Sequence, residues 1–185
     1  MRKTILTGLF CLAALPAFAA GLLIGAVNAA GAPHFGVAAD PARIKAWDIS
    51  ILPDGTNLPA GKGSVKEGAD IYAAKCQMCH GAEGRGQPAD RLTGGVGSLT
   101  TQQPIKTVAS YWPYATTLFD YIRRAMPVNH PHSLNDHEAY ALVAYILSID
   151  GIVKKDAVLD AKSLPKIKMP NRDGFIDESA KASMQ

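Results

Sequence analysis

The pentapeptide Cys76-Gln77-Met78-Cys79-His80 decides the fold. Two thiols three positions apart, followed at once by an imidazole, form the C-x-x-C-H pattern of covalent haem attachment. Within one helical turn both thiols reach the vinyl groups on one porphyrin edge, and the histidine lies under the iron as the proximal ligand. The pattern predicts one covalently bound haem c, attached through Cys76 and Cys79 and ligated by His80.

Two other kinds of site use a C-x-x-C pair. A zinc site needs two more Cys or His ligands at suitable spacing. A thioredoxin-like redox pair does not need the adjoining histidine. The chain has three cysteines, and Cys11 lies in an apolar N-terminal segment that we expect to be removed. Cys76 and Cys79 would both be consumed as thioethers, which leaves no thiol for a disulfide.

Residues 1–30 have the parts of a secretory signal. A short basic head, Met1-Arg2-Lys3, precedes an apolar stretch that runs from Ile5 to Ala30. Small residues favour cleavage near 19/20 or near 29–30. The alternative is an uncleaved anchor helix, because the stretch is long enough to span a bilayer. In either case we expect the body of the protein outside the cytoplasm, most simply in a bacterial periplasm, where this type of haem attachment takes place.

The net charge of +3 carries little information about partners. Removing Arg2 and Lys3 with the signal lowers it to +1, and two haem propionates would offset that. Nothing in the charge pattern favours nucleic acid. The remaining length suits one domain with extensions.

We predict an all-α fold with a haem domain over 64–151, an N-terminal arm over 31–63 and a C-terminal arm over 152–185. The N-terminal arm is rich in Pro and Gly and has no sustained helical pattern. Its apolar points, Trp47 and Ile49 among them, favour packing on the haem domain or on a partner. The C-terminal arm is polar with scattered apolar residues, so we expect it to wrap the domain or a partner and to fray after Asp177.

Two helices should cross in the haem domain. Ser64 and Glu67 form a capping box that predicts a helix leading to Cys76. Asn135 and Glu138 can cap a second helix, from Asp136 to about Asp150. Gly68 and Tyr72 lie one turn apart on the first helix, and this spacing suits a close crossing with the second. The helical faces are marked by Val65, Gly68, Ile71 and Tyr72 and by Ala139, Leu142, Val143, Ile146 and Ile149.

A glycine-rich loop over 81–97 follows the pentapeptide. No strand–loop–helix frame surrounds it, so a phosphate cradle is not indicated. We expect a backbone carbonyl of this loop to accept the other ring N–H of His80 and to fix the orientation of the imidazole.

An aromatic string, Tyr111-Trp112-Pro113-Tyr114, leads into a short helix expected from Thr117 to Ala125. The Trp112 indole N–H either donates to a haem propionate or simply packs in the core. Arg123 and Arg124 either neutralise propionates, meet an acidic partner or remain solvated.

Met126 is the predicted distal ligand of the iron. Pro127 disfavours helical geometry in the residue before it, so the helix ends by Met126 in an extended Met-Pro step. A thioether there can be presented to the iron face opposite His80, where it favours ferrous iron and raises the potential. The competing candidates are His130, His132, His137 and Met169.

Together these features resemble the small class I cytochrome c domain. Longer strings carry a narrower likeness, to the cytochrome subunit of bacterial sulfane dehydrogenase (SoxD-type) and its sulfite dehydrogenase relatives. These strings are Ala46-Trp47-Asp48-Ile49, Leu52-Pro53-Asp54-Gly55-Thr56 and the run from Ser110 to Pro127. The likeness covers roughly Phe35 to Ile176. This sequence differs from the larger SoxD-type proteins in one respect: it has a single C-x-x-C-H, whereas those proteins have a second haem domain.

The resemblance implies that the cytochrome accepts electrons from a molybdenum-cofactor subunit that oxidises a sulfur compound. It also implies Cys76 and Cys79 as haem attachments, His80 as proximal ligand and Met126 as distal ligand. We therefore expect an electron-transfer subunit that passes electrons to another cytochrome or a terminal oxidase and is not catalytic alone. The alternatives are a generic periplasmic carrier, or a haem enzyme or sensor with an open or displaceable sixth ligand.

Overall fold

The structure, a computed structural model, describes residues 35–176 and residue 178. The chain divides into two units, Met1–Ala39 and Asp40–Gln185, and every element below belongs to the second unit. The predicted signal over 1–30 lies outside the described residues, as does nearly all of the C-terminal end for which we predict fraying. Among the described residues, no helix is both long enough and apolar enough to cross a membrane.

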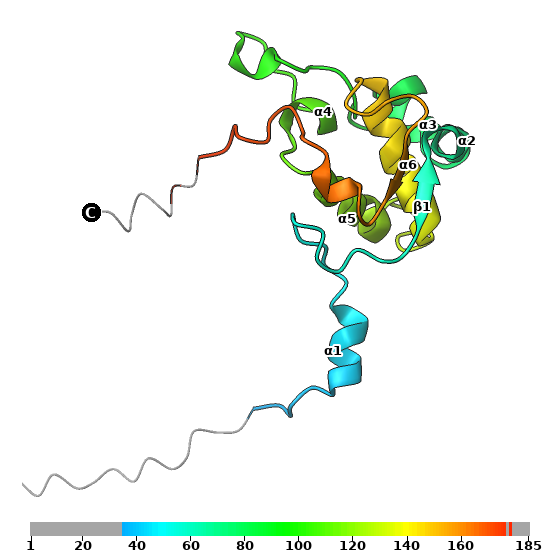
Figure 1. The fold of residues 1–185 in the computed structure, drawn as a ribbon, viewed down its shortest axis with the longest axis vertical. Helices are drawn as coiled ribbons and strands as arrows, with labels where there is room; N and C mark the ends of the chain where they lie inside the picture. Colours follow the sequence, from blue (N-terminus) through cyan, green and yellow to red (C-terminus); the bar gives the residue numbers. More distant parts are fainter. Residues whose placement is uncertain (1–34, 177, 179–185) are drawn as a thin grey trace, which may run out of the picture. The chain divides into compact units, whose positions relative to one another are not determined.

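Helices dominate the fold, as predicted (Figure 1). A single pair of short strands is the other regular element of the described residues. In chain order the elements are α1 (Pro41–Trp47), β1 (Lys62–Ser64), α2 (Val65–Lys75), α3 (Gln77–His80), the 3-10 turns η1 (Ala82–Gly84) and η2 (Ser98–Thr100), α4 (Val108–Tyr111), α5 (Ala115–Ala125), α6 (Asp136–Ile149), β2 (Val158–Asp160) and the 3-10 turn η3 (Leu164–Lys166).

The predicted crossing of α2 with α6 is confirmed. Gly68 is buried, and a Cβ atom at this position would run into the backbone carbonyl of Ala141 on α6. One turn further along α2, Tyr72 packs on Tyr145 with ring centroids 5.2 Å apart. Both predicted capping boxes are present, at the start of α2 and at the start of α6. The absence of a side chain at Gly68 therefore lets α2 and α6 approach closely. This crossing fixes the position of the end of α2, which leads to Cys76.

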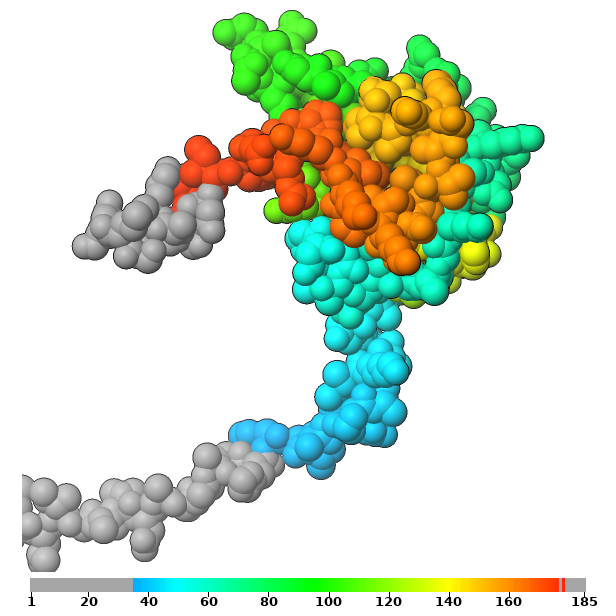
Figure 2. All heavy atoms as spheres, in the orientation of Figure 1, coloured from blue at the N-terminus to red at the C-terminus, as the bar shows by residue number. Residues whose placement is uncertain are grey.

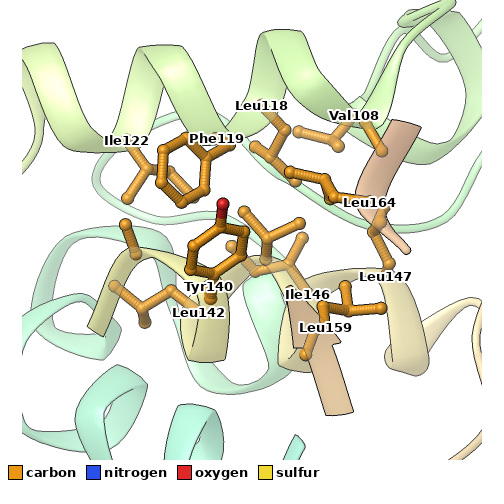
Figure 3. Packing of buried hydrophobic residues seen from close by; sticks show 14 of the residues in the cluster. Val108, Leu118, Phe119, Ile122, Tyr140, Leu142, Ile146, Leu147, Leu159 and Leu164 are labelled. Carbon is orange, nitrogen blue, oxygen red and sulfur yellow. The ribbon is translucent and has the colours of Figure 1, made fainter. Parts of the chain in front are cut away.

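The hydrophobic core lies between α5, α6 and the C-terminal arm (Figure 3). Phe119 of α5 and Tyr140 of α6 are fully buried, with ring centroids 4.4 Å apart. Leu159 and Leu164, from the C-terminal arm, are also buried in this cluster. The arm therefore contributes to the core itself, which agrees with the prediction that it wraps the domain.

The two arms also pair with each other. β1 and β2 form an antiparallel two-stranded sheet in which Gly63 lies opposite Leu159. Figure 2 shows the C-terminal arm, orange to red, on the same face as the cyan segment that precedes α2. This sheet was not predicted, because three-residue strands carry no measurable alternation and their pairing joins segments far apart in the sequence.

Two details of the N-terminal arm and α5 differ from the expectation. Asp40 caps a short helix, α1, with Pro41 at its first position, although no helix was predicted there. Among the apolar residues of the arm, Ile51 is buried in the core, as expected for packing on the domain, whereas Trp47 is 79% exposed, which leaves the predicted contact with a partner for this side chain. Finally, α5 begins at Ala115 instead of Thr117. The sequence did not indicate this start, because the N-cap residue, Tyr114, forms no side-chain capping hydrogen bond.

Candidate functional site

The C-x-x-C-H turn forms where α2 ends. Cys76 closes α2 through its N–H, which donates to the Tyr72 carbonyl at 2.9 Å. Cys79 and His80 then donate back to the Cys76 carbonyl at 3.1 and 3.0 Å. Both cysteines are free thiols and half-buried. Burial raises the pKa of the Cys76 thiol to about 11. The turn thus gathers two thiols and one imidazole within five residues.

The imidazole of His80 is oriented by a loop carbonyl, as predicted. Its Nδ1 lies 2.9 Å from the carbonyl oxygen of Asp90. This contact assigns the N–H to Nδ1 and leaves Nε2 as the ring nitrogen with a free lone pair. The sequence predicted the type of contact but not its residue, because any carbonyl of the loop satisfies the same pattern.

Backbone hydrogen bonds fold the loop onto the turn. The N–H groups of Gly86 and Ala89 donate at 2.8 Å to the carbonyls of His80 and Cys79, respectively. The buried Tyr72 hydroxyl donates to the Gly81 carbonyl at 2.9 Å, and burial raises the pKa of this phenol to about 12. The Asp90 carbonyl, which orients His80, therefore lies in a loop that is held against the C-x-x-C-H turn by hydrogen bonds between neighbouring residues.

Asp150 and Thr107 anchor the next part of the loop and were not identified from the sequence. The Asp150 carboxylate, at the end of α6, accepts from the Gly94 N–H at 2.9 Å. The Thr107 hydroxyl donates to the Gly94 carbonyl at 2.6 Å. Both backbone hydrogen-bonding groups of Gly94 are thus bound by side chains distant in sequence. No local pattern could have shown this.

Met126 lies at the end of α5, where it was expected. Its N–H donates to the Ile122 carbonyl at 3.1 Å, and its backbone is extended, with φ −114° and ψ 147°. The side chain is half-buried. A thioether in this position belongs neither to the core nor to the open surface.

The other candidate ligands occupy different surroundings. Met169 is 1% exposed and packs in the hydrophobic core. His137 is exposed, and its Nδ1 lies 2.9 Å from the Lys62 carbonyl. His130 and His132 are exposed in the segment after Met126.

Trp112 is half-buried and packs edge-on against Tyr121, with ring centroids 5.6 Å apart. Arg123 and Arg124 each pair with a carboxylate of the chain. Arg123 Nε donates to Asp136 at 2.8 Å, and Arg124 donates to Asp120, four residues earlier, at 2.7 and 2.9 Å. The i,i+4 spacing of Asp120 and Arg124 is a signal that sequence reasoning could have used.

The donor set of this turn fits haem c. Two unoxidised thiols one turn apart can form thioethers, and His80 keeps one ring nitrogen free for iron. A zinc site would need further ligands. In the part of the chain that the structure describes, no group of three or more His, Cys, Asp or Glu side chains is placed to hold a metal ion.

A helical fold built on a C-x-x-C-H turn with an oriented histidine defines a c-type cytochrome. The cytochrome c family model matches residues 65–150. A chain in the crystal structure of the sulfane dehydrogenase SoxCD from Paracoccus pantotrophus superposes with a TM-score of 0.74 at 38% identity. That match covers 82% of this chain and 75% of the other. The protein belongs to the cytochrome c family, whose domain implies covalently bound haem c.

Two thiosulfate dehydrogenases are also similar. The protein from Psychrobacter arcticus is 28% identical over 118 residues, which cover 58% of this chain. The protein from Stutzerimonas stutzeri is 29% identical over 124 residues, which cover 55% of this chain. In each case the match spans 36% of the relative's own length. The likeness therefore concerns about a third of those dehydrogenases.

Proposed function

We propose that this protein is a periplasmic cytochrome with one haem c that transfers single electrons in sulfur oxidation. Its partner in this proposal is a molybdenum-cofactor dehydrogenase that oxidises sulfite or a sulfane compound. The observation that carries the proposal is the 38% identity to a chain of a sulfane dehydrogenase, over 82% of this chain. This match is wider than the 65–150 span of the cytochrome c family model, so it includes parts of the arms as well.

The residues take defined roles in this proposal. Cys76 and Cys79 would attach the haem, His80 would ligate iron through Nε2, and Met126 would supply the second ligand of the iron. Bound haem c supplies reversible one-electron chemistry at iron. The Asp90 carbonyl holds the N–H of His80 and strengthens the imidazole as a ligand. Trp112 would donate its indole N–H to a propionate.

Electron transfer requires few further features of the protein. The chain has to hold the haem at a fixed orientation, exclude water from the iron and leave an edge for contact. With His80 and Met126 both donating a lone pair to iron, no coordination position would be left for a substrate, which favours electron transfer over substrate binding. Electrons then pass to a downstream cytochrome or oxidase.

Similarity to the thiosulfate dehydrogenases favours a second candidate. In this case the chain itself would oxidise thiosulfate, with a distal ligand that leaves the iron or never binds it. The two candidates differ in whether the isolated chain reacts with a sulfur compound.

Purification of the natural complex separates them. The full chain is isolated from its source under mild conditions, and the preparation is analysed for iron and molybdenum. We expect molybdenum to co-purify, and we expect sulfite or a sulfane donor to reduce the haem in the complex but not in the separated cytochrome. A preparation without molybdenum, or a haem that stays oxidised, would refute the partner. Rapid reduction of the separated cytochrome by thiosulfate would favour the second candidate.

A further inference from the structure

An ion pair joins the last turn of α5 to the first residue of α6. Arg123 Nε donates to Asp136 Oδ1 at 2.8 Å, and the two side chains are 25% and 32% exposed. A charge-assisted hydrogen bond between partly buried groups is stronger than a solvated surface pair. Because Arg123 and Asp136 flank residues 124–135, this pair closes that loop at its base.

The loop 124–135 contains more than one side chain that can ligate iron. Met126 is near its start, and His130 and His132 follow. Both histidines are exposed, and neither imidazole forms a hydrogen bond within the described part of the chain. Inside the loop, the His130 N–H donates to the Pro127 carbonyl at 2.8 Å, and Leu134 is buried. Three side chains that can ligate iron therefore share one loop, and only the two imidazoles are exposed.

A second brace acts on the same turn of α5. Arg124 donates to both carboxylate oxygens of Asp120, and Asp120 Oδ1 also accepts from the backbone N–H of Ile51 at 3.2 Å. The end of α5, from which Met126 projects, is thus tied to the N-terminal arm through Asp120 and to α6 through Arg123. Arg123 and Arg124 therefore both stabilise the C-terminal end of α5, the helix that precedes Met126.

We propose that the Arg123–Asp136 pair is a positioning element that keeps Met126, and not His130 or His132, as the distal ligand. The inference rests on the proposed function through the assignment of Met126. A loop closed at its base samples fewer conformations, so opening the pair widens the reach of both imidazoles. The exchange would replace one lone-pair donor, the thioether sulfur, by another, an imidazole nitrogen, so the oxidation state of the iron would not change.

The test uses the full-length holoprotein and the weak far-red absorption of ferric haem with a Met ligand. Arg123→Gln removes the pair and should lower the ratio of Met-ligated to other forms about three- to tenfold, as expected for one partly buried ion pair. Arg123→Lys keeps the charge and should retain most of the band. The reduction potential should fall in Arg123→Gln, since imidazole replaces thioether.

Lys75→Gln is the matched control. Lys75 of α2 pairs with Glu138, also in the first turn of α6, at 2.6 Å and with similar exposure of 38% and 21%. This variant should lose comparable stability and keep the far-red band. Equal loss of the band in Lys75→Gln would show general destabilisation and would overturn the inference.

Removing the imidazoles identifies the replacing ligand. In Arg123→Gln combined with His130→Ala and His132→Ala, the band should return. A triple variant that stays without the band would overturn the exchange, as would Arg123→Gln with an unchanged spectrum. Both results leave the proposed function intact. A wild type that lacks the band refutes Met126 as ligand, and the inference with it.

Discussion

The two sides of the candidate haem site are held in different ways. On the proximal side, loop 81–90 folds back on the C-x-x-C-H turn through backbone hydrogen bonds, and a backbone carbonyl orients His80. On the candidate distal side, Met126 projects from a helix end that the Arg123–Asp136 ion pair ties to α6 and that a hydrogen bond from the Ile51 N–H to Asp120 ties to the N-terminal arm. The proximal frame is local and built mainly from peptide groups, with the Tyr72 hydroxyl as the one side-chain donor described above, whereas the distal frame depends on side chains.

This difference has a physical consequence. Because the backbone hydrogen bonds of the proximal side lie within one short loop, we expect them to be lost together when that loop unfolds. A side-chain pair can open while both helices stay folded. We therefore expect substitutions on the proximal side to act on attachment and folding. Substitutions on the distal side should act on ligation and potential.

The largest expected effect is on the proximal side. Replacing Cys76 and Cys79 together by Ser removes both thioether sulfurs, so no haem remains attached after denaturation. Haem staining of a denaturing gel and the intact mass check this. Haem that stays covalently bound in the double variant would contradict the assignment of the attachment site.

A pair of glycine variants measures how rigid the proximal frame is. Gly81 has φ +72°, and a Cβ there would run into the Gly86 carbonyl. Gly97 has φ +80° with open space around it. Gly97→Ala should lower the free energy of unfolding by about 1 kcal/mol through backbone strain alone. Gly81→Ala should cost on the order of 3 kcal/mol, because a clash is added to the strain. Urea titration of both holoproteins gives the difference.

Equal costs for the two variants would mean that loop 81–90 can move away from the turn. In that case the proximal frame would be no more rigid than the distal one, and the comparison would fail.

Met126→Ala tests the distal side in isolation. The variant should keep covalent haem and lose the far-red band. It should bind cyanide on the order of tenfold or more tightly, which corresponds to at least about 1.4 kcal/mol. Met169→Leu is the control, because Met169 is buried in the core and the change conserves volume. Loss of the band in Met169→Leu but not in Met126→Ala would reverse the assignment of the ligand.

Tyr140→Phe should have the smallest effect on the haem site. It is a control, because Tyr140 belongs to neither the proximal nor the distal side. The Tyr140 hydroxyl donates to the Pro59 carbonyl at 2.9 Å, and its loss should cost about 1 kcal/mol. Neither the haem spectrum nor the potential should change. A changed far-red band would mean that the core and the distal loop are coupled.

The pH dependence of this variant follows from the phenol. Burial raises the pKa of Tyr140 to about 12, against an ordinary value of 10.0. The stabilisation from the neutral phenol is complete below pH 10 and is lost as the pH rises towards 12. Thermal unfolding between pH 9 and 11 should therefore show a steeper loss for wild type than for Tyr140→Phe.

Local patterns predicted much of this molecule. The C-x-x-C-H turn, the capping boxes at Ser64 and Asn135, and the effect of Pro127 on Met126 all depend on residues close in the sequence. The crossing at Gly68 was also predictable, since a glycine one turn from an aromatic residue favours close helix approach. Each of these features has one dominant cause that lies within a few residues.

Long-range contacts were beyond such reasoning. The pairing of β1 with β2, the grip of Asp150 on Gly94 and the bond from Arg123 to Asp136 join segments that only the folded chain brings together. The short helix α1 was missed for a different reason. Asp40 and Pro41 are a start signal, but the surrounding Pro and Gly content favoured an irregular arm.

The ferric absorption spectrum of the full-length holoprotein, recorded before and after addition of cyanide, tests the central claim most directly. An electron-transfer cytochrome with His80 and Met126 on iron predicts a low-spin spectrum with the weak far-red band and slow cyanide binding. A high-spin spectrum without that band, together with rapid cyanide binding, would contradict the account and would indicate an iron that is open to substrate.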